Sequence, residues 1–299
     1  MTDADPQRVA CMQGLLADIG QRLASGELVA SEAVCLAVEC MENEPLYNAG
    51  RGSVLDADGN ISMDASIMRG HDQAAGSVVG LQSSRHPVRA AKRLMENGWP
   101  VMLAGPAGDV FAAENGVEQV EKAWLETQLR RAQWDKWRRE RLRPGATDEE
   151  DALLDHDAEH DGWGTVGAVA LDVHGNLAAA TSTGGMTGKP PGRVGDTPII
   201  GAGTWADKHI AVSCTGVGEA FIRTAAAHAV ASFHQDRSLE SAADAMLDLV
   251  EPLGGRGGVI AVNQKGEVVM PFRTMLMYRG WYRDGAVDVG IGPSFLQSS

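Results

Sequence analysis

Four short segments that combine glycines with hydroxyl and charged side chains lie close together in the stretch 164–219. A threonine hydroxyl is a weak nucleophile unless a base lies beside it. One solution is to place the threonine at the start of a chain, where its own free amine takes the proton. That solution requires a cut in the chain just before the threonine. The four segments are Gly164-Thr165-Val166-Gly167, Thr181-Ser182-Thr183-Gly184-Gly185, Gly192-Arg193-Val194-Gly195-Asp196 and Ser213-Cys214-Thr215-Gly216-Val217-Gly218-Glu219.

The residues just before Thr165 suit such a cut. The stretch 147–161 holds eight acidic residues and no Lys or Arg. This composition is typical of a flexible, solvated linker, which we place at about 144–163. The linker is followed by Gly164, and Thr165 opens an apolar run that predicts a buried strand. This is the arrangement that a cut between Gly164 and Thr165 would need.

The other segments supply partners for that nucleophile. Thr183 and Thr215 can hydrogen-bond the nucleophile or a developing oxyanion, and the Gly216 amide is a small, close donor. Arg193 can bind a carboxylate through two parallel hydrogen bonds, and Asp196 can receive an ammonium group. Together the last two would recognise an α-amino acid. Each residue also has a purely structural interpretation, since threonine is common in strands and an Arg-x-x-Asp pair is common on surfaces.

Long stretches of the chain resemble the plant-type L-asparaginase and isoaspartyl peptidase family of N-terminal nucleophile hydrolases. The core of the resemblance is GTVGAVALDVHGNLAAATSTGGMTGKPPGRVGDTPIIGAGTWAD (164–207) with CTGVGE (214–219). The stretches 45–70, 86–105 and 257–272, with MYRGW (277–281), are also similar to that family. The resemblance therefore covers most of the chain outside the linker.

The resemblance implies an α+β fold, a four-layer αββα sandwich, made as one domain over 1–299. Self-cleavage would give an α chain, 1–164, and a β chain, 165–299, which stay together and pair as a dimer of αβ units. The implied substrates are small molecules, β-aspartyl dipeptides and L-asparagine, and the reaction needs no organic cofactor. The implied site has Thr165 as nucleophile, Thr183, Thr215 and Gly216 as activating and oxyanion partners, Arg193, Asp196, Gly216 and Gly218 around the substrate, and Asn48 near the nucleophile.

A metal ion is considered at two places. The loop 41–51 resembles one whose main-chain carbonyls bind sodium, and oxygen ligands suit a hard cation. In the linker, His156 and His160 have a spacing that could hold a metal on a helix, but few apolar residues could anchor one, so a disordered linker is favoured. The implied sodium ligands are the carbonyls of Met41, Glu42, Glu44, Tyr47, Ala49 and Arg51.

The chain departs from the family pattern in two places. Family members open with a strand ending in His-Gly-Gly-Ala-Gly, whereas helical spacing here begins by Arg8. We expect the position of that strand inside a sheet to be unfilled, which would lower stability and slow self-processing. After PF the chain has Arg273-Thr274-Met275-Leu276 where the family has an Asn-Thr or Asn-Ser and Glu-Gly pattern. The alternatives left open are a non-processing homologue that binds amino acids or a partner, and a glycosylasparaginase-like hydrolase.

Composition excludes several other classes. The 299 residues carry 26 basic and 40 acidic side chains, a net charge of −14, which disfavours nucleic-acid binding. The basic stretch 129–143 contains Trp134 and Trp137 at helical spacing, which favours packing over RNA contact. No apolar run reaches the roughly 18 residues of a membrane span, and no secretion signal opens the chain. Four cysteines without a CxxC pair predict neither a disulfide framework nor zinc. Because no secretion signal is seen, a cytoplasmic location is expected.

The expected elements alternate between strand-rich and helical regions. Helices are expected over 8–41, as two helices interrupted by a turn at 25–27, and over 87–97, 109–141, 219–235 and 241–250. Hairpins are expected at 47–68, 165–183 and 257–272, with further strands at 75–82, 101–104, 199–202 and 209–215. Runs of strands with segregated helices predict two sheets covered by helices, an α+β domain.

Overall fold

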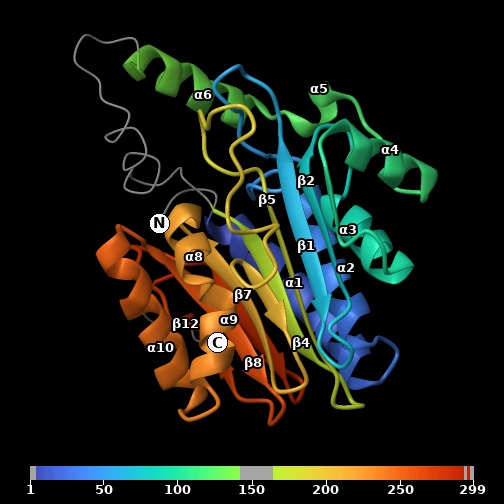
Figure 1. The fold of residues 1–299 in the computed structure, drawn as a ribbon, viewed down its shortest axis with the longest axis vertical. Helices are drawn as coiled ribbons and strands as arrows, with labels where there is room; N and C mark the ends of the chain where they lie inside the picture. The colour runs from blue at the N-terminus through green and yellow to red at the C-terminus, as the bar shows by residue number, and fades with distance from the viewer. Residues whose placement is uncertain (1–4, 142–163, 293–294, 297–299) are drawn as a thin grey trace.

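Two β-sheets pack face to face at the centre of the structure, a computed structural model that describes residues 5–141, 164–292 and 295–296 (Figure 1). The first sheet has the order β3-β2-β1-β5-β4, and all its neighbours are antiparallel except β2 and β3. Its strands are β1 Met63–Arg69, β2 Ala75–Leu81, β3 Met102–Ala104, β4 Val166–Leu171 and β5 Leu177–Thr183. The central strands therefore come from both sides of the expected cut.

The second sheet is antiparallel throughout and has the order β6-β7-β8-β9. A smaller sheet, β10-β11-β12, lies under the first helix. The strands are β6 Thr204–Ala206, β7 Ile210–Gly216, β8 Gly257–Asn263, β9 Val268–Val269, β10 Arg279–Arg283, β11 Ala286–Gly290 and β12 Phe295–Leu296.

Helices cover the outer face of each large sheet (Figure 1). On the first sheet, α2 (Ala30–Asn43) packs against β4 and β5, and α3 (Pro87–Asn97) packs against β1 and β2. On the second sheet, α9 (Ala226–Phe233) packs against β7, and α10 (Leu239–Val250) packs against β8. The first helix, α1 (Asp5–Ala24), packs beside α2 and covers β10 and β11. No helix of the described chain is both long and apolar enough to cross a membrane.

Every residue of β5 is buried, although most of its side chains are short and several are polar, LAAATST. One face of β5 lies against α2 and the other lies against β6 and β7 of the second sheet. A strand covered on both faces normally carries large apolar residues. Here alanines fill both faces, so the helix and the opposite sheet approach closely.

The basic stretch forms α6 (Gln128–Arg141), whose inner face packs on the loop before β1. The indole Nε1 of Trp134 donates to Asp56 O at 2.7 Å, and the guanidinium of Arg130 donates through Nε to Gly52 O at 2.6 Å. Trp137 lies against Gly188. The expectation that both tryptophans serve packing is confirmed. The helix is preceded by α4 (Pro106–Glu114) and α5 (Lys122–Leu125), so the single helix expected over 109–141 was wrong.

Three other expected elements differ from the structure for local reasons. The stretch 199–202 is a turn rather than a strand, because Ala202 N and Gly203 N both donate to Ile199 O. The helix expected over 219–235 is divided into α8 (Gly218–Thr224) and α9, since Ala225 adopts a φ of +48°. The hairpins at 47–68 and 257–272 are shorter than expected, and the first keeps only the bridge between Leu55 and Ile61 ahead of β1. The linker 144–163, with His156 and His160, lies outside the described residues, which resume at Gly164.

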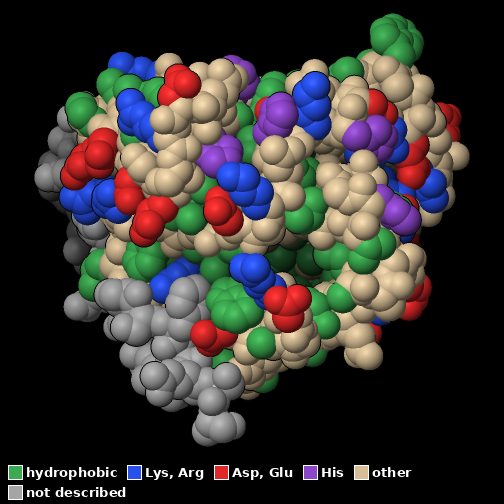
Figure 2. Space-filling view, turned by 90° about the horizontal axis from the view of Figure 1, so that it is seen from below, with side chains coloured by type: hydrophobic (Ala, Val, Ile, Leu, Met, Phe, Trp, Pro, Cys, Tyr) green, Lys and Arg blue, Asp and Glu red, His purple; other side chains and the backbone are tan. Residues whose placement is uncertain are grey.

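A cavity of about 640 Å³ runs beside β4. Among the described residues, β5 is the only strand paired with β4, and the edge strand β10 is paired only with β11. The cavity lies beside both strands, and α1 and β8 also line it. Its walls there are mainly apolar, from Leu16 and Ile19 of α1 to Ile260 and Val262 of β8. Figure 2 shows a hollow with hydrophobic side chains inside it. The unfilled strand position inside a sheet stays a prediction; this space lies where β4 has no second partner among the described strands.

Filling that space should stabilise the protein. An N-terminal extension of about six residues with alternating apolar side chains could reach it from α1, pair with β4 and bury apolar surface at roughly 25 cal/mol per Å². We expect the melting temperature to rise by about 2–4 °C for each kcal/mol gained. Calorimetry of the original and the extended protein measures this. The control extension carries proline at alternate positions, which removes the N–H donors. Equal melting temperatures of the original, extended and control proteins would contradict the prediction.

Candidate active site

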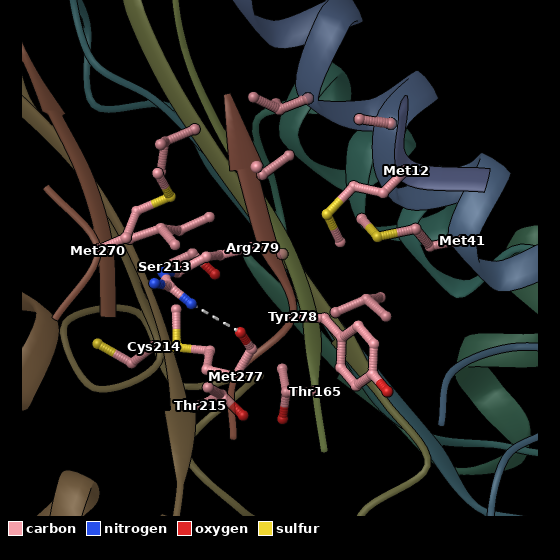
Figure 3. A pocket seen from close by; sticks show the side chains of 18 of the residues that line it. Met12, Met41, Thr165, Ser213, Cys214, Thr215, Met270, Met277, Tyr278 and Arg279 are labelled. Carbon is pink, nitrogen blue, oxygen red and sulfur yellow. Dashed lines mark hydrogen bonds between the residues drawn. The ribbon is translucent and has the colours of Figure 1, made fainter. Parts of the chain in front are cut away.

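The three threonines of the sequence analysis meet at one end of the cavity. Thr165 directly precedes β4, and the pairing of Val166 with Ser182 brings it beside Thr183 at the end of β5. Thr215 comes from β7 on the opposite sheet, with its Oγ1 2.9 Å from the position that a Cβ on Gly164 would take. In Figure 3, Thr165 and Thr215 lie on facing strands beside the same space. The expected cut and its partners are therefore in one place.

Glycines let the second sheet come close to that place. Gly216 has a φ of +153°, and a Cβ there would collide with Arg256 O and the Phe221 ring. Gly218, which opens α8, lies against Asp196: a Cβ on it would be 2.9 Å from Asp196 N. Gly216 lines the cavity, whereas Gly218 supports Asp196 from behind.

Asn48 fixes the turn that follows Thr183. Its Nδ2 donates to Gly185 O at 2.7 Å, and its Oδ1 accepts from Val54 N at 3.0 Å. Its main-chain carbonyl accepts from Gly184 N at 2.9 Å. The Gly185 amide in turn donates to Thr183 Oγ1 at 2.9 Å. The Thr183 oxygen thus receives one hydrogen bond from the turn, and its own hydrogen is left to serve another acceptor.

Arg193 lies in the cavity wall and is held by a carboxylate that the sequence analysis did not single out. Its Nε donates to Glu219 Oε1 at 2.8 Å and its Nη2 to Oε2 at 2.9 Å. The arginine side chain is 14% exposed and the glutamate 54% exposed. Glu219 therefore orients the guanidinium, and its position directly after Gly218 was the only sequence signal for this role.

Asp196 is fully buried at the edge of the cavity, and its Oδ2 has no hydrogen-bond partner among the described residues. Burial raises the pKa of this carboxyl to about 7, against the weaker opposing effects of backbone N–H donors and of Arg193. A buried, unpartnered carboxylate at the edge of a cavity can receive a cationic group. The structure thus brings Asp196 and Arg193 to one wall, as the sequence predicts.

A buried lysine and aspartate lie behind the turn at 184–185, and sequence reasoning missed both. Lys189 Nζ donates to Ser62 O at 2.7 Å and packs under Gly185. Asp64, the cross-strand partner of Thr183, accepts from Gly80 N at 2.8 Å. Burial lowers the pKa of Lys189 and raises that of Asp64, while each opposes the shift of the other through its charge. The pair supports the turn from below.

Known proteins are similar to this sequence along most of its length. A model of the asparaginase family matches residues 4–291. An isoaspartyl peptidase of Escherichia coli strain K12 is 43% identical over 274 residues, which cover 89% of this chain and 83% of the relative. The chain belongs to the asparaginase family. An isoaspartyl peptidase/L-asparaginase of Bos taurus is 40% identical over 285 residues (93% of this chain, 89% of the relative), and one of Rattus norvegicus is 41% identical over 266 residues (88% and 76%).

Membership of the asparaginase family confirms the resemblance seen in the motifs at 164–219.

The loop 41–51 is the one for which the resemblance implies a sodium ion. Glycines let this loop fold back on itself, since Gly50 has a φ of +51° and Gly52 a φ of +98°. The Glu42 carbonyl accepts from Arg51 N at 2.8 Å, and the Tyr47 carbonyl lies against Gly52. Main-chain oxygens of the loop thus lie close against its two glycines, and oxygen is the ligand type that a hard cation prefers. No group of three or more His, Cys, Asp or Glu side chains suited to a metal occurs in the described parts of this asparaginase-family chain.

The segment that departs from the family pattern also lies at the cavity. Thr274 and Leu276 line the wall, and Thr274 Oγ1 donates to Leu276 O at 3.0 Å. Arg273 points away and forms an ion pair with Asp244 at 2.8 Å. The departure from the family pattern at 273–276 therefore lies partly on the cavity wall of this asparaginase-family protein.

Proposed function

We propose that this chain is an N-terminal threonine amidohydrolase that cleaves isoaspartyl dipeptides and L-asparagine. The observation that carries the proposal is the placement of Thr165: it directly follows Gly164, lies beside Thr183 and Thr215, and shares one cavity with Arg193 and Asp196. The names of the relatives, isoaspartyl peptidase and isoaspartyl peptidase/L-asparaginase, support the substrate class. The helix-covered pair of facing sheets supports a four-layer αββα sandwich of the N-terminal nucleophile hydrolase type.

Cleavage between Gly164 and Thr165 would activate the nucleophile. The new α-amine of Thr165 takes the proton of its own hydroxyl, and Oγ1 attacks the side-chain carbonyl of the substrate. Thr215 and the Gly216 amide stabilise the oxyanion, and Thr183 donates its remaining hydrogen to the nucleophile. Ammonia or an amino acid leaves with a proton, and water then hydrolyses the ester on Thr165. The residues supply all of this chemistry without an organic cofactor.

The aspartyl half of the substrate would be held by two opposite charges. Arg193 binds the α-carboxylate, and Asp196 binds the α-ammonium group. Because Glu219 already holds Nε and Nη2 of Arg193, the guanidinium is oriented before the substrate binds. The substrate carboxylate then shares the guanidinium with Glu219. The leaving group is not contacted by this pair, so both a free amide and a dipeptide fit the scheme.

The two chains produced by the cut would remain associated. Strand β5 of the second chain pairs along its length with β1 of the first, and α2 of the first chain covers β4 and β5. We propose that the αβ units pair as dimers in the cytoplasm. We also propose a structural sodium ion in the loop 41–51, held by the carbonyls of Met41, Glu42, Glu44, Tyr47, Ala49 and Arg51.

The first test is chain cleavage. Purified protein should separate into two chains, and the smaller, 165–299, should have a mass of about 14 kDa and begin with Thr-Val-Gly-Ala. Edman sequencing and mass spectrometry measure this. Thr165→Ala should abolish both cleavage and hydrolysis, whereas Thr224→Ala, which removes a hydroxyl in α8, should leave both intact. A protein that stays uncut while it hydrolyses the substrate would contradict the nucleophile assignment. A protein that stays uncut and inactive would favour a non-processing homologue that binds amino acids or a partner.

Substitution of Arg193 by lysine tests recognition. Lysine keeps the charge but loses the planar two-point contact with a carboxylate. We expect kcat/KM for β-aspartyl substrates to fall by an amount equivalent to a loss of about 2–4 kcal/mol of transition-state stabilisation. Cleavage of the chain before Thr165 should be preserved. The matched control is Arg223→Lys on the exposed side of α8. Unchanged kinetics in a fully cleaved Arg193→Lys protein would place this arginine outside the site.

The raised pKa of Asp196 predicts how ligand binding depends on pH. Below about pH 7 the carboxyl is protonated in the free protein and cannot pair with an ammonium group. Affinity for L-aspartate should therefore fall as the pH drops through 7, approaching tenfold per unit below the pKa. Succinate has both carboxylates and no amine, so the ratio of the two inhibition constants isolates this contact. A ratio that stays constant from pH 8 to pH 5.5 would contradict the role of Asp196.

A further inference from the structure

A row of buried hydroxyl groups crosses between the two sheets just below the three threonines. Thr181 Oγ1 hydrogen-bonds Ser213 Oγ at 2.8 Å and also contacts Thr204 Oγ1. Ser66 Oγ lies 2.7 Å from Thr204 Oγ1 and donates to Thr197 O at 2.6 Å. All four side chains are buried. They link β1, β5, β6 and β7, and we call them the hydroxyl row.

Strand periodicity places this row directly beside the candidate catalytic residues. Side chains two residues apart share one face of a strand. Thr181 is two residues before Thr183 on β5, and Ser213 is two residues before Thr215 on β7. Gly167, two residues after Thr165, pairs across the sheet with Thr181. Each strand that carries a threonine of the site thus also contributes a position at the hydroxyl row.

The contact at Gly167 is close enough to exclude a side chain. A Cβ there would collide with Ser213 Oγ. The Ser213 hydroxyl therefore fills the space over β4 and bonds Thr181 on β5, the neighbouring strand. In Figure 3, Ser213 and Thr215 lie along the same strand, which faces the strand of Thr165. The position of β7 relative to β4 and β5 is consequently set at this point, one pleat from the nucleophile.

The same row holds the segment that follows Asp196. Ser66 donates to Thr197 O, and Ser77, the cross-strand partner of Ser66, donates to Pro198 O. Carbonyls only accept, so the Ser66 hydrogen goes to Thr197. Each of the four hydroxyls of the row thus has at least one hydrogen-bond partner inside it, and Thr181 also donates to Gly203 O at 3.3 Å.

Packing alone does not require hydroxyls at these positions. Between two sheets, apolar groups of the same shape avoid the cost of removing hydroxyls from water, and replacing both partners of a hydrogen bond can be neutral or stabilising. Hydrogen bonds are directional, however, and an apolar interface allows the sheets to slide relative to each other. We propose that the hydroxyl row is a positioning network that sets Thr183 and Thr215 relative to Thr165 and sets Asp196 relative to all three. This inference rests on the proposed function.

Substitutions within the row should separate turnover from binding. Thr181→Val keeps the shape but removes the link to Ser213, so kcat should fall on the order of 10–100-fold in the cleaved protein, with KM changed less than about threefold. Thr181→Ser restores the hydroxyl and should recover most of kcat. Ser66→Ala releases Thr197 O, so it should raise KM for β-aspartyl substrates more than it lowers kcat. The assays use isoaspartyl dipeptides and the mature, cleaved protein.

The matched control is Ser84→Ala. Ser84 is also fully buried and donates to Asp109 at 2.8 Å, away from the cavity. Its loss should lower the melting temperature with kcat and KM unchanged. If Thr181→Val does not fold, Ser213→Ala removes the same link from β7 and is measured in its place. A loss of activity that follows melting temperature equally in all variants would overturn the positioning role.

The outcomes separate this inference from the proposed function. A wild-type chain that hydrolyses no β-aspartyl substrate would overturn both. An active wild type with an inactive Thr165→Ala variant and a fully active Thr181→Val variant would leave the proposed function standing and overturn the hydroxyl row alone. The kcat loss in Thr181→Val, its recovery in Thr181→Ser and the KM effect of Ser66→Ala together support it.

Discussion

The separation of the two facing sheets is the constraint on which the candidate site depends. Thr183 belongs to the first sheet and Thr165 directly precedes its strand β4, whereas Thr215 and Gly216 belong to the second sheet, so no single sheet holds the complete set. The short side chains of β5 let α2 and the second sheet approach it from both sides. Larger residues there would push the layers apart, since a packed interior cannot absorb even one extra methylene without strain. The alanine-rich strand is thus a requirement of the site as well as of the core.

Charged side chains around the cavity are held in place by other residues before any ligand binds. Glu219 holds Arg193 from the solvent side, and Lys189 supports the turn of Gly185 from the buried side. Asp196 is left with an oxygen that has no partner among the described residues. A buried carboxylate without a partner costs stability. A cationic group of a ligand would offset that cost under the proposed role of Asp196.

Much of the site could be predicted from the sequence because its parts are local. The threonines and glycines of 164–219 lie in strands and the turns after them, where two-residue alternation and turn chemistry act over a few residues. The partner of Arg193 could not be found this way, since Glu219 is 26 residues distant and reaches it only through the fold. Likewise the turn at 199–203 and the break at Ala225 depend on each other: Ala227 N and His228 N donate to Ala202 O and Gly201 O. Helical spacing in 219–235 contains no sign of that contact.

The position of β4 makes the placement of Thr165 depend on few contacts. Among the described strands β4 is paired only with β5, and the cavity lies along its other side. A cut before Thr165 would free the first residue of this strand from the chain that precedes it. The nucleophile would then be located by pairing with β5, by α2 on one face and by Ser213 against Gly167 on the other. Two of these three contacts, β5 and Ser213, lie in the second chain itself, and the third, α2, comes from the first chain. Both chains would therefore take part in placing the threonine against Thr183 and Thr215.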